Sequence, residues 1–139
     1  MDAVPPDPLV DEILDHYERH LGPPTRIDHL PSGLHVGAWI DRPSRGAVTH
    51  ATAGLATHTL VQDSRIVRQE LLIATASGWE SPAIGGLLSH MAGQVALMRR
   101  PLLFGEAIPL EIRVHGLPDI AGFVAIDPRY FREELYLVA

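Results

Sequence analysis

The chain has 139 residues, of which 46% are hydrophobic and 20% are charged, a composition typical of globular proteins and not of disordered or fibrous ones. This length fits a single domain, residues 1–139, that buries roughly two thirds of its unfolded surface. Cysteine is absent. The sequence therefore excludes a disulfide framework, thiol catalysis and cysteine-ligated zinc, and it suits a reducing compartment.

All eleven basic residues are arginine, and the formal net charge is -6. Because there is no lysine, Schiff-base catalysis and a Walker phosphate loop are excluded. The longest basic run is Arg99-Arg100, so the clustered positive charge that nucleic-acid phosphates require is missing. This charge balance favours a basic protein as the partner.

The N-terminus lacks the pattern of a secretory signal, because acidic residues interrupt its apolar residues from Asp2 onward. The uncharged segment from Ser81 to Met98 approaches the length of a membrane span, but glycine, serine, histidine and glutamine residues interrupt it. The sequence therefore predicts a cytoplasmic protein that does not cross a membrane.

The first predicted element is an amphipathic helix that begins at Asp7-Pro8 and ends at Gly22-Pro23-Pro24. Its outer face is acidic, which is typical either of a solvated helix surface or of a docking surface for a basic protein. The apolar stripe of this helix comprises Leu9, Val10, Ile13, Leu14, Tyr17 and Leu21. The candidate protein-binding residues on the acidic face are Asp11, Glu12, Asp15 and Glu18.

Short strands separated by turns rich in proline, glycine and serine are predicted next. Strand-like pieces extend from Ile27 to Ile40, with Leu34–Ile40 the clearest; a second extended run covers Ala47–Ala53, and residues 55–66 form a loop or hairpin connection. Alternating apolar and polar residues predict a largely buried strand over Val67–Ile73. Because the connection between them is short, we expect Ala47–Ala53 and Gln69–Ala76 to be neighbouring strands.

A long helix is predicted from an N-cap at Ser81 to the end of the uncharged segment. Small residues at Gly86, Ser89 and Gly93 form a second face that would let another backbone approach closely. His90 lies on this face and is interpreted as a hydrogen-bonded core or boundary histidine. The main apolar stripe of the helix comprises Ile84, Leu87, Leu88, Met91, Val95 and Met98.

Two further alternating segments, Ile108–Val114 and Ala121–Ile126, predict strands, and Leu135–Val138 predicts a short final strand or tail. The order of elements is therefore helix, strands, helix, strands. We expect an α+β fold with a mostly antiparallel or mixed sheet of about five to six strands, against which two main helices pack.

Three motifs follow one another at a recognisable spacing: His50–Ala56 (HATAGLA), Arg68–Leu72 (RQELL) and, after the long helix, Leu103–Pro109 (LFGEAIP). In this succession the chain resembles the suppressor of fused domain family, and in particular its small bacterial single-domain members. The resemblance extends from Asp11 to Leu137.

This resemblance implies a function in protein binding. Animal relatives hold a transcription factor between this domain and a second one, which the present chain is too short to contain, so their ligand site is not carried over. Bacterial relatives are regarded as immunity proteins that neutralise toxins, often nucleases. We therefore expect a protein partner, with a cognate toxin as the candidate, and the acidic charge balance suits a basic toxin surface. No cofactor is expected, and the sequence does not indicate an oligomeric state.

A metal site at His16 and His20 is the next hypothesis, because these residues lie one helical turn apart and Glu12 precedes them. The metalloprotease pattern, however, requires a glutamate directly after the first histidine, where Tyr17 stands. Ligation also needs at least a third partner. We therefore assign no metal ligands and expect folding to be independent of metal.

Arg68 and Glu70 share one face of their predicted strand and form a candidate structural ion pair, an interpretation favoured over catalysis. Glu106 is a general acid by residue type, but no spacing places a nucleophile or second carboxylate beside it. The nucleophile elbow, Walker and dinucleotide motifs are missing, so no catalytic residue is assigned. A protein-binding domain is the first hypothesis. The alternative is a small-molecule-binding or enzymatic α+β domain with a pocket between sheet and helix.

Overall fold

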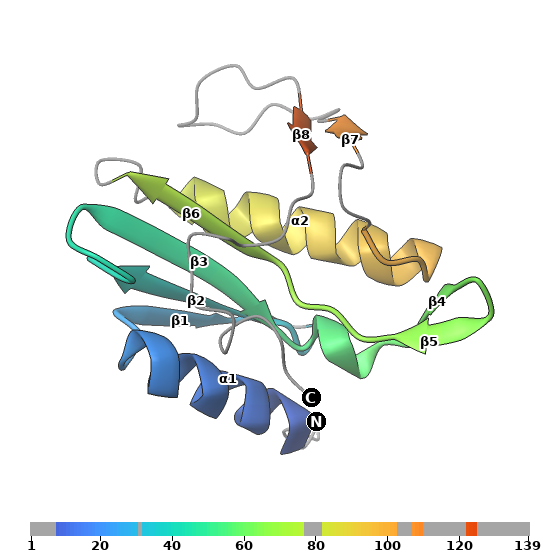
Figure 1. Cartoon of the computed structure of the whole chain (residues 1–139), viewed down its shortest axis with the longest axis horizontal. Coiled ribbons are helices and arrows are strands. Elements are labelled where there is room, and N and C mark those ends of the chain that lie inside the picture. The colour runs from blue at the N-terminus through green and yellow to red at the C-terminus, as the bar shows by residue number, and fades with distance from the viewer. Residues whose placement is uncertain (1–7, 31, 77–81, 103–106, 110–121, 125–139) are drawn as a thin grey trace.

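We describe the chain from a computed structural model, which defines residues 8–30, 32–76, 82–102, 107–109 and 122–124 (Figure 1). The elements in chain order are α1 (Pro8–Leu21), β1 (Arg26–His29), β2 (His35–Ile40), β3 (Ala47–Ala53), the 3-10 helix η1 (Leu55–Thr57), β4 (Leu60–Gln62), β5 (Arg65–Val67), β6 (Leu72–Ala76), α2 (Pro82–Met98), β7 (Ala107–Pro109) and β8 (Gly122–Val124).

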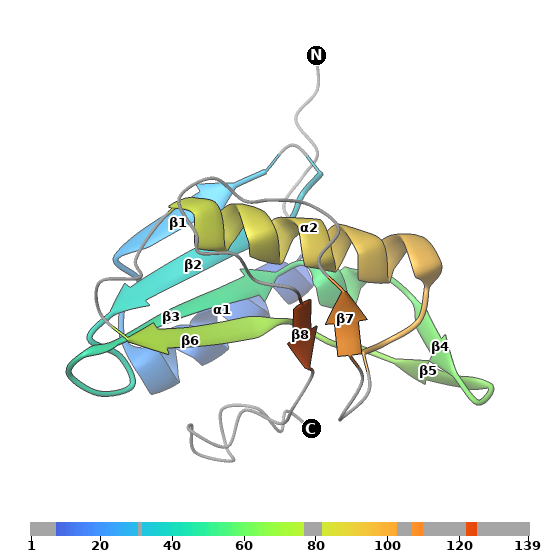
Figure 2. The same cartoon turned by 90° about the horizontal axis from the view of Figure 1, so that it is seen from above.

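Within the described residues, the main sheet has four antiparallel strands in the order β1-β2-β3-β6. Helix α1 covers one face of this sheet and α2 covers the other, so the described residues form three layers (Figures 1 and 2). The expected α+β class is confirmed. The main sheet is smaller than the expected five to six strands, because β4–β5 and β7–β8 form two separate two-stranded sheets.

Strand β3 is buried along its whole length, since a helix lies on each side of the sheet and a strand on each edge. Its side chains are alanine, valine, threonine and histidine, which allow close packing on both faces. The core on the α1 side comprises Val10, Tyr17, Leu21, Trp39, Ala51 and Ala53. A second cluster, near the end of α2, comprises Leu55, Leu60, Ala92 and Val95.

The predicted pairing of Ala47–Ala53 with the strand after it is confirmed, since β3 pairs antiparallel with β6 from Ala47↔Ala76 to Ala51↔Leu72. The continuous strand predicted over Val67–Ile73 is wrong. Val67 ends β5 and Leu72 begins β6, and residues 68–71 between them have no regular secondary structure. At Leu71 the ladder is irregular: its carbonyl accepts from the Thr52 amide at 2.9 Å, but its own amide donates to the side-chain oxygen of Thr52 at 2.8 Å and not to a backbone carbonyl.

Helix α2 matches its prediction in extent, and five residues of its stripe are buried, but Met98 is 61% exposed because the helix there has reached its last residue. His90 is exposed, which corrects its interpretation as a core or boundary histidine. It follows Gly86 and precedes Gly93 on the solvent side of the helix. A Cβ atom at either glycine would meet nothing within 4 Å, so the close backbone approach expected on this face is not found.

Several predicted features lie outside the described residues or only partly within them. The cap positions Asp7 and Ser81 lie outside, as do Glu106 and the predicted strand Leu135–Val138. The two late strands are seen only as β7 and β8, which pair antiparallel through Ala107↔Val124, Ile108↔Phe123 and Pro109↔Gly122.

Trp39 is the largest fully buried side chain among the described residues and fixes how α1 meets the sheet. Its ring lies edge-on to Tyr17, with ring centroids 5.5 Å apart, and its indole Nε1 donates to the Gly22 carbonyl at 2.8 Å. The ring extends over Gly37, two residues earlier on β2, where an added Cβ would lie 2.5 Å from the ring atom Cη2. Only glycine therefore fits at this position without moving the indole.

We expect Gly37→Ala to destabilise the fold by about 1 to 3 kcal/mol, because the methyl group overpacks a ring that a hydrogen bond holds in place. Gly86→Ala is the matched control, and it should stabilise by about 0.5 to 1 kcal/mol because its helical site is open. Urea unfolding followed by circular dichroism measures both changes. Equal stability of the Gly37→Ala variant and the parent would contradict this packing.

Candidate functional site

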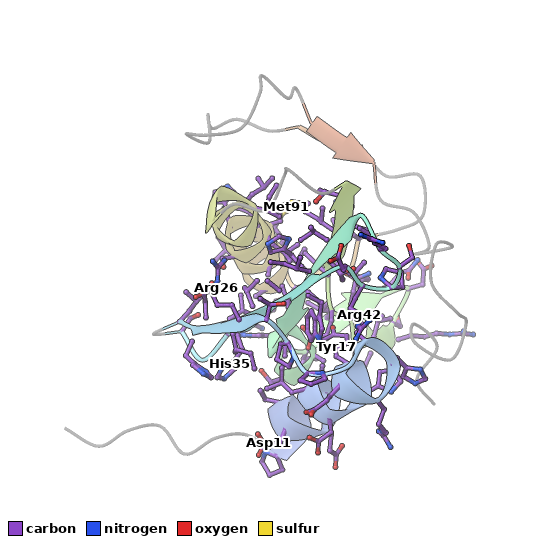
Figure 3. The ribbon with its side chains drawn as sticks, turned by 90° about the vertical axis from the view of Figure 1, so that its left-hand side faces the viewer. Asp11, Tyr17, Arg26, His35, Arg42 and Met91 are labelled. Carbon is purple, nitrogen blue, oxygen red and sulfur yellow. The ribbon has the colours of Figure 1, made fainter. Side chains whose placement is uncertain are left out.

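The acidic face of α1, defined as Asp11, Glu12, Asp15 and Glu18, is exposed at all four positions. The opposite side of the helix packs into the core through Val10, Tyr17 and Leu21, so the acidic side is held toward solvent. Figure 3 shows this arrangement, with Asp11 on the outer side of α1 and Tyr17 directed at the sheet. The structure thus presents the predicted residues together on one surface.

The acidic face carries like-charge repulsion, which Arg19, four residues after Asp15 on the same helix, offsets only in part. Asp11 and Asp15 are four residues apart, and Asp15 and Glu18 are three apart, so like charges are neighbours on the helix surface. Such pairs destabilise a helix by about 0.2 to 0.5 kcal/mol each. A cationic surface placed against this face would remove that cost and add attraction of its own.

Two histidine pairs lie near the acidic face. The rings of His16 and His20 are 4.7 Å apart, as the helical spacing predicts. His29 and His35 face each other across β1 and β2 and contact through their Nδ1 atoms, a pair that the sequence analysis missed. Burial lowers the pKa of His35, His29 lowers it further, and Asp11 acts in the opposite direction. Within the described ranges, no group of three or more histidine, cysteine, aspartate or glutamate residues is arranged to hold a metal ion.

We expect EDTA to leave the melting temperature of the purified chain unchanged, because its fold is held by apolar packing and hydrogen bonds in the described residues. Differential scanning calorimetry with and without the chelator measures this. A fall of many degrees would contradict it.

The most heavily hydrogen-bonded side chain of the described structure is the Glu70 carboxylate. It accepts hydrogen bonds from the amides of Gly54, Leu55 and Ala56, at 2.9, 3.1 and 3.0 Å, and from the Thr52 hydroxyl at 2.8 Å. These amides belong to the first turn of η1, whose free N–H groups have no partner within the turn. Glu70 therefore caps η1 from a distant part of the chain.

The candidate ion pair of Arg68 with Glu70 takes a different form from the one predicted. The Arg68 guanidinium donates to the Ala56 carbonyl at 2.7 Å, and no ion pair joins it to Glu70 among the described residues. Both side chains instead bind the backbone of η1, one at its amides and the other at a carbonyl. The prediction of a fixed structural role fits these contacts, but the direct pairing does not.

Tyr17 links this cluster to α1. Its hydroxyl donates to the Thr52 carbonyl at 2.8 Å, and Thr52 is also the residue whose side chain donates to Glu70. Burial raises the pKa of the Tyr17 hydroxyl well above 10.0, and the nearby Glu70 carboxylate raises it further. Tyr17 therefore stays a neutral donor. The sequence holds one signal for this cluster: Glu70 is an acidic residue in an apolar stretch and therefore requires a polar partner. Residue spacing alone did not identify that partner.

Burial also raises the pKa of Glu70 above its ordinary value of 4.5, although the hydrogen bonds from Ala56, Gly54, Thr52 and Leu55 act in the opposite direction. The folded chain thus holds a proton on this carboxyl more readily than the unfolded chain does. Its contribution to stability is greatest below pH 4.5 and is reduced as the pH rises through the raised pKa.

We expect Glu70→Gln to destabilise the fold by about 2 to 4 kcal/mol at neutral pH, because its amide nitrogen cannot accept hydrogen bonds from the η1 amides. The difference in free energy of unfolding between the parent and the variant should increase as the pH falls toward 4.5. The raised pKa of Glu70 stabilises the parent on acidification, whereas glutamine does not titrate. Urea titrations at several pH values measure the difference. A difference in unfolding free energy that decreases on acidification would contradict the raised pKa of Glu70.

His50 is a buried histidine on the α2 side of the sheet, and its Nδ1 has no hydrogen-bond partner. Burial lowers its pKa, the Arg26 cation lowers it further, and Asp28 acts in the opposite direction. Arg26 and Asp28 form an ion pair on β1, at 3.2 Å. A neutral imidazole has one donor and one acceptor nitrogen, so it is chemically able to bind a small polar molecule.

Comparisons with known proteins identify no relative: no protein-family model matches the chain, and no match is found among curated proteins or solved structures. Among the described helices, none has the length and apolar content to cross a membrane.

Proposed function

We propose that the chain is a protein-binding domain that meets a basic partner through the acidic face of α1. The observation that carries this proposal is the joint exposure of Asp11, Glu12, Asp15 and Glu18 on one side of a helix whose other side is fixed in the core. The net charge of -6 adds a long-range attraction for cationic proteins.

A rigid support makes this surface suitable for binding. Tyr17 joins α1 to the end of β3 through its hydroxyl, and the ring of Trp39 packs against it. The helix backbone therefore has little freedom to lose when a partner docks, and a preorganised surface binds more tightly than a mobile one with the same contacts.

The resemblance to small bacterial suppressor of fused domains supports a cognate toxin as the partner, with the chain acting as its immunity protein in the cytoplasm. A nuclease toxin binds phosphates through a positively charged surface. An acidic domain that covers such a surface would block substrate access and would associate rapidly through electrostatic steering.

We expect the double variant Asp15→Asn/Glu18→Gln to associate about three to ten times more slowly at low salt with the proposed partner, a basic toxin sought among the products of neighbouring genes, because steering depends on these charges. High salt should bring the two rates together, since screening removes the parent's advantage. Surface plasmon resonance at two ionic strengths measures both effects.

The matched control is His90→Arg/Gln94→Arg, which changes the net charge by the same amount at exposed positions of α2, on the other side of the sheet. Circular dichroism should show an intact fold in both variants. If the control slows association as much as the α1 variant does, net charge and not the acidic face governs binding, and the proposed contact is wrong.

A second candidate function is the binding of a small polar molecule between the sheet and α2. It rests on two buried polar atoms without hydrogen-bond partners, His50 Nδ1 and Thr75 Oγ1, in the described structure. Such atoms are rare in folded proteins and require an occupant such as water or a ligand.

A further inference from the structure

We propose that the hairpin β4–β5 and the end of α2 form a second binding surface, which takes an acidic protein segment that carries apolar side chains. This surface is distinct from the acidic face of α1 and does not depend on the function proposed for it.

Exposed apolar side chains gather at this end of the molecule. The described residues include five large hydrophobic side chains that are exposed, and four of them lie here; the fifth is Ile40, on β2. Single exposed apolar residues are ordinary on protein surfaces, whereas a group of them marks an interaction site. We call these four the hairpin patch: Val61 (45% exposed), Ile66 (70%), Leu97 (78%) and Met98 (61%).

The hairpin holds its part of the patch toward solvent. Its two-residue turn, Asp63-Ser64, has positive φ at both positions, 49° and 65°, which is the turn geometry that matches the twist of a tight hairpin. Val61 and Ile66 are directly opposite in the register and therefore share one face. On the other face, Leu60 is fully buried against Ala92 and Val95 of α2. One face anchors the hairpin, and the other is left uncovered.

A backbone hydrogen bond joins the two parts of the patch. The Val61 amide donates to the Arg99 carbonyl at 2.8 Å, so the chain leaving α2 runs beside β4 (Figures 1 and 2). Arg99 has a φ of 55°, the left-handed conformation that ends a helix. Met98 directly precedes it, which brings the exposed end of α2 next to Val61.

The charge around the patch selects the partner. Among the described residues of the hairpin and of the chain that leaves α2, Arg65 and Arg99 are exposed cations, and the one acidic residue is Asp63, in the turn of the hairpin. The described part of this end therefore carries a net positive charge. Arginine beside apolar residues is typical of binding surfaces, because its guanidinium pairs with carboxylates while its stem covers apolar groups. An acidic segment with apolar side chains satisfies both features.

The experiment is a titration of the isotope-labelled full chain, followed by amide chemical shifts, with a synthetic peptide that alternates glutamate with leucine and tryptophan. One comparison peptide has lysine at every glutamate, and a second has serine at every apolar position. We expect saturable shifts at residues 60–67 and 97–100 with the first peptide only. The lysine peptide should shift α1 amides instead, which tests the acidic face separately.

Variants at the patch should weaken binding in two different ways. Ile66→Ser removes exposed apolar surface and should raise the Kd of the acidic peptide about tenfold. Arg65→Glu retains the apolar residues and should raise the Kd at low salt but much less at high salt. Ile40→Ser is the matched control at an exposed apolar position outside the patch, and it should leave the Kd unchanged. All three positions are exposed, so the fold should persist, as circular dichroism would show.

Three results would overturn the proposal: no saturable shift with the acidic peptide, shifts that fall outside the patch, or equal binding of the lysine peptide at the patch. Shifts at the patch that depend on the concentration of the chain alone would also overturn it, because they would identify a second copy of the chain as the occupant.

Discussion

The carboxylate of Glu70 is the interaction on which the rest of the described structure depends. It satisfies three amides of η1 and the hydroxyl of Thr52, so it joins the end of β3, the turn after it and the segment before β6. Thr52 also connects this cluster to α1, because its carbonyl accepts a hydrogen bond from the Tyr17 hydroxyl. A buried charge is costly to desolvate, and the four hydrogen bonds offset that cost only because all are made together. The position of α1 is thereby coupled to the geometry of a single turn.

The same turn sets where β6 begins its regular pairing with β3, at Leu72 opposite Ala51. Arg68 and Glu70 both bind the backbone of η1, and along residues 68–71 the pairing with β3 is irregular: the Leu71 carbonyl accepts from the Thr52 amide, while the Leu71 amide donates to the Thr52 side chain. The chain before them is free to form β4 and β5 as a separate hairpin, which Leu60 anchors under α2. A polar cluster thus sets the sheet boundary, and the exposed hairpin is a consequence of it.

Local patterns predicted the elements whose structure depends on local chemistry. Both helices and β3 follow from apolar spacing and from proline and glycine at their ends, and the neighbouring position of β3 and β6 follows from a short connection. The exposure of Met98 and His90 was not predicted, because helical spacing gives the direction of a side chain but not the extent of the sheet beneath it. The hydrogen-bond partners of Glu70 were not predicted either. They lie between 14 and 18 residues away along the chain, and hydrophobic periodicity carries no information about contacts at that separation. The acidic face of α1 was visible in full, because it lies on one helix.

The two proposed binding surfaces, the acidic face of α1 and the hairpin patch, carry opposite charges. In the described residues, the carboxylates of the acidic face lie on the outer side of α1, and exposed arginines lie on the hairpin and directly after α2, so these two surfaces differ in charge. Charges of one sign steer a partner toward a surface, while apolar groups retain it after contact by burial. The acidic face of α1 is charged, and the apolar residues of that helix are buried in the core. The hairpin patch combines exposed apolar side chains with nearby charged residues. The first surface is therefore suited mainly to fast, salt-sensitive association. The second is suited to contacts that persist at higher salt, because burial of apolar area is not screened by ions.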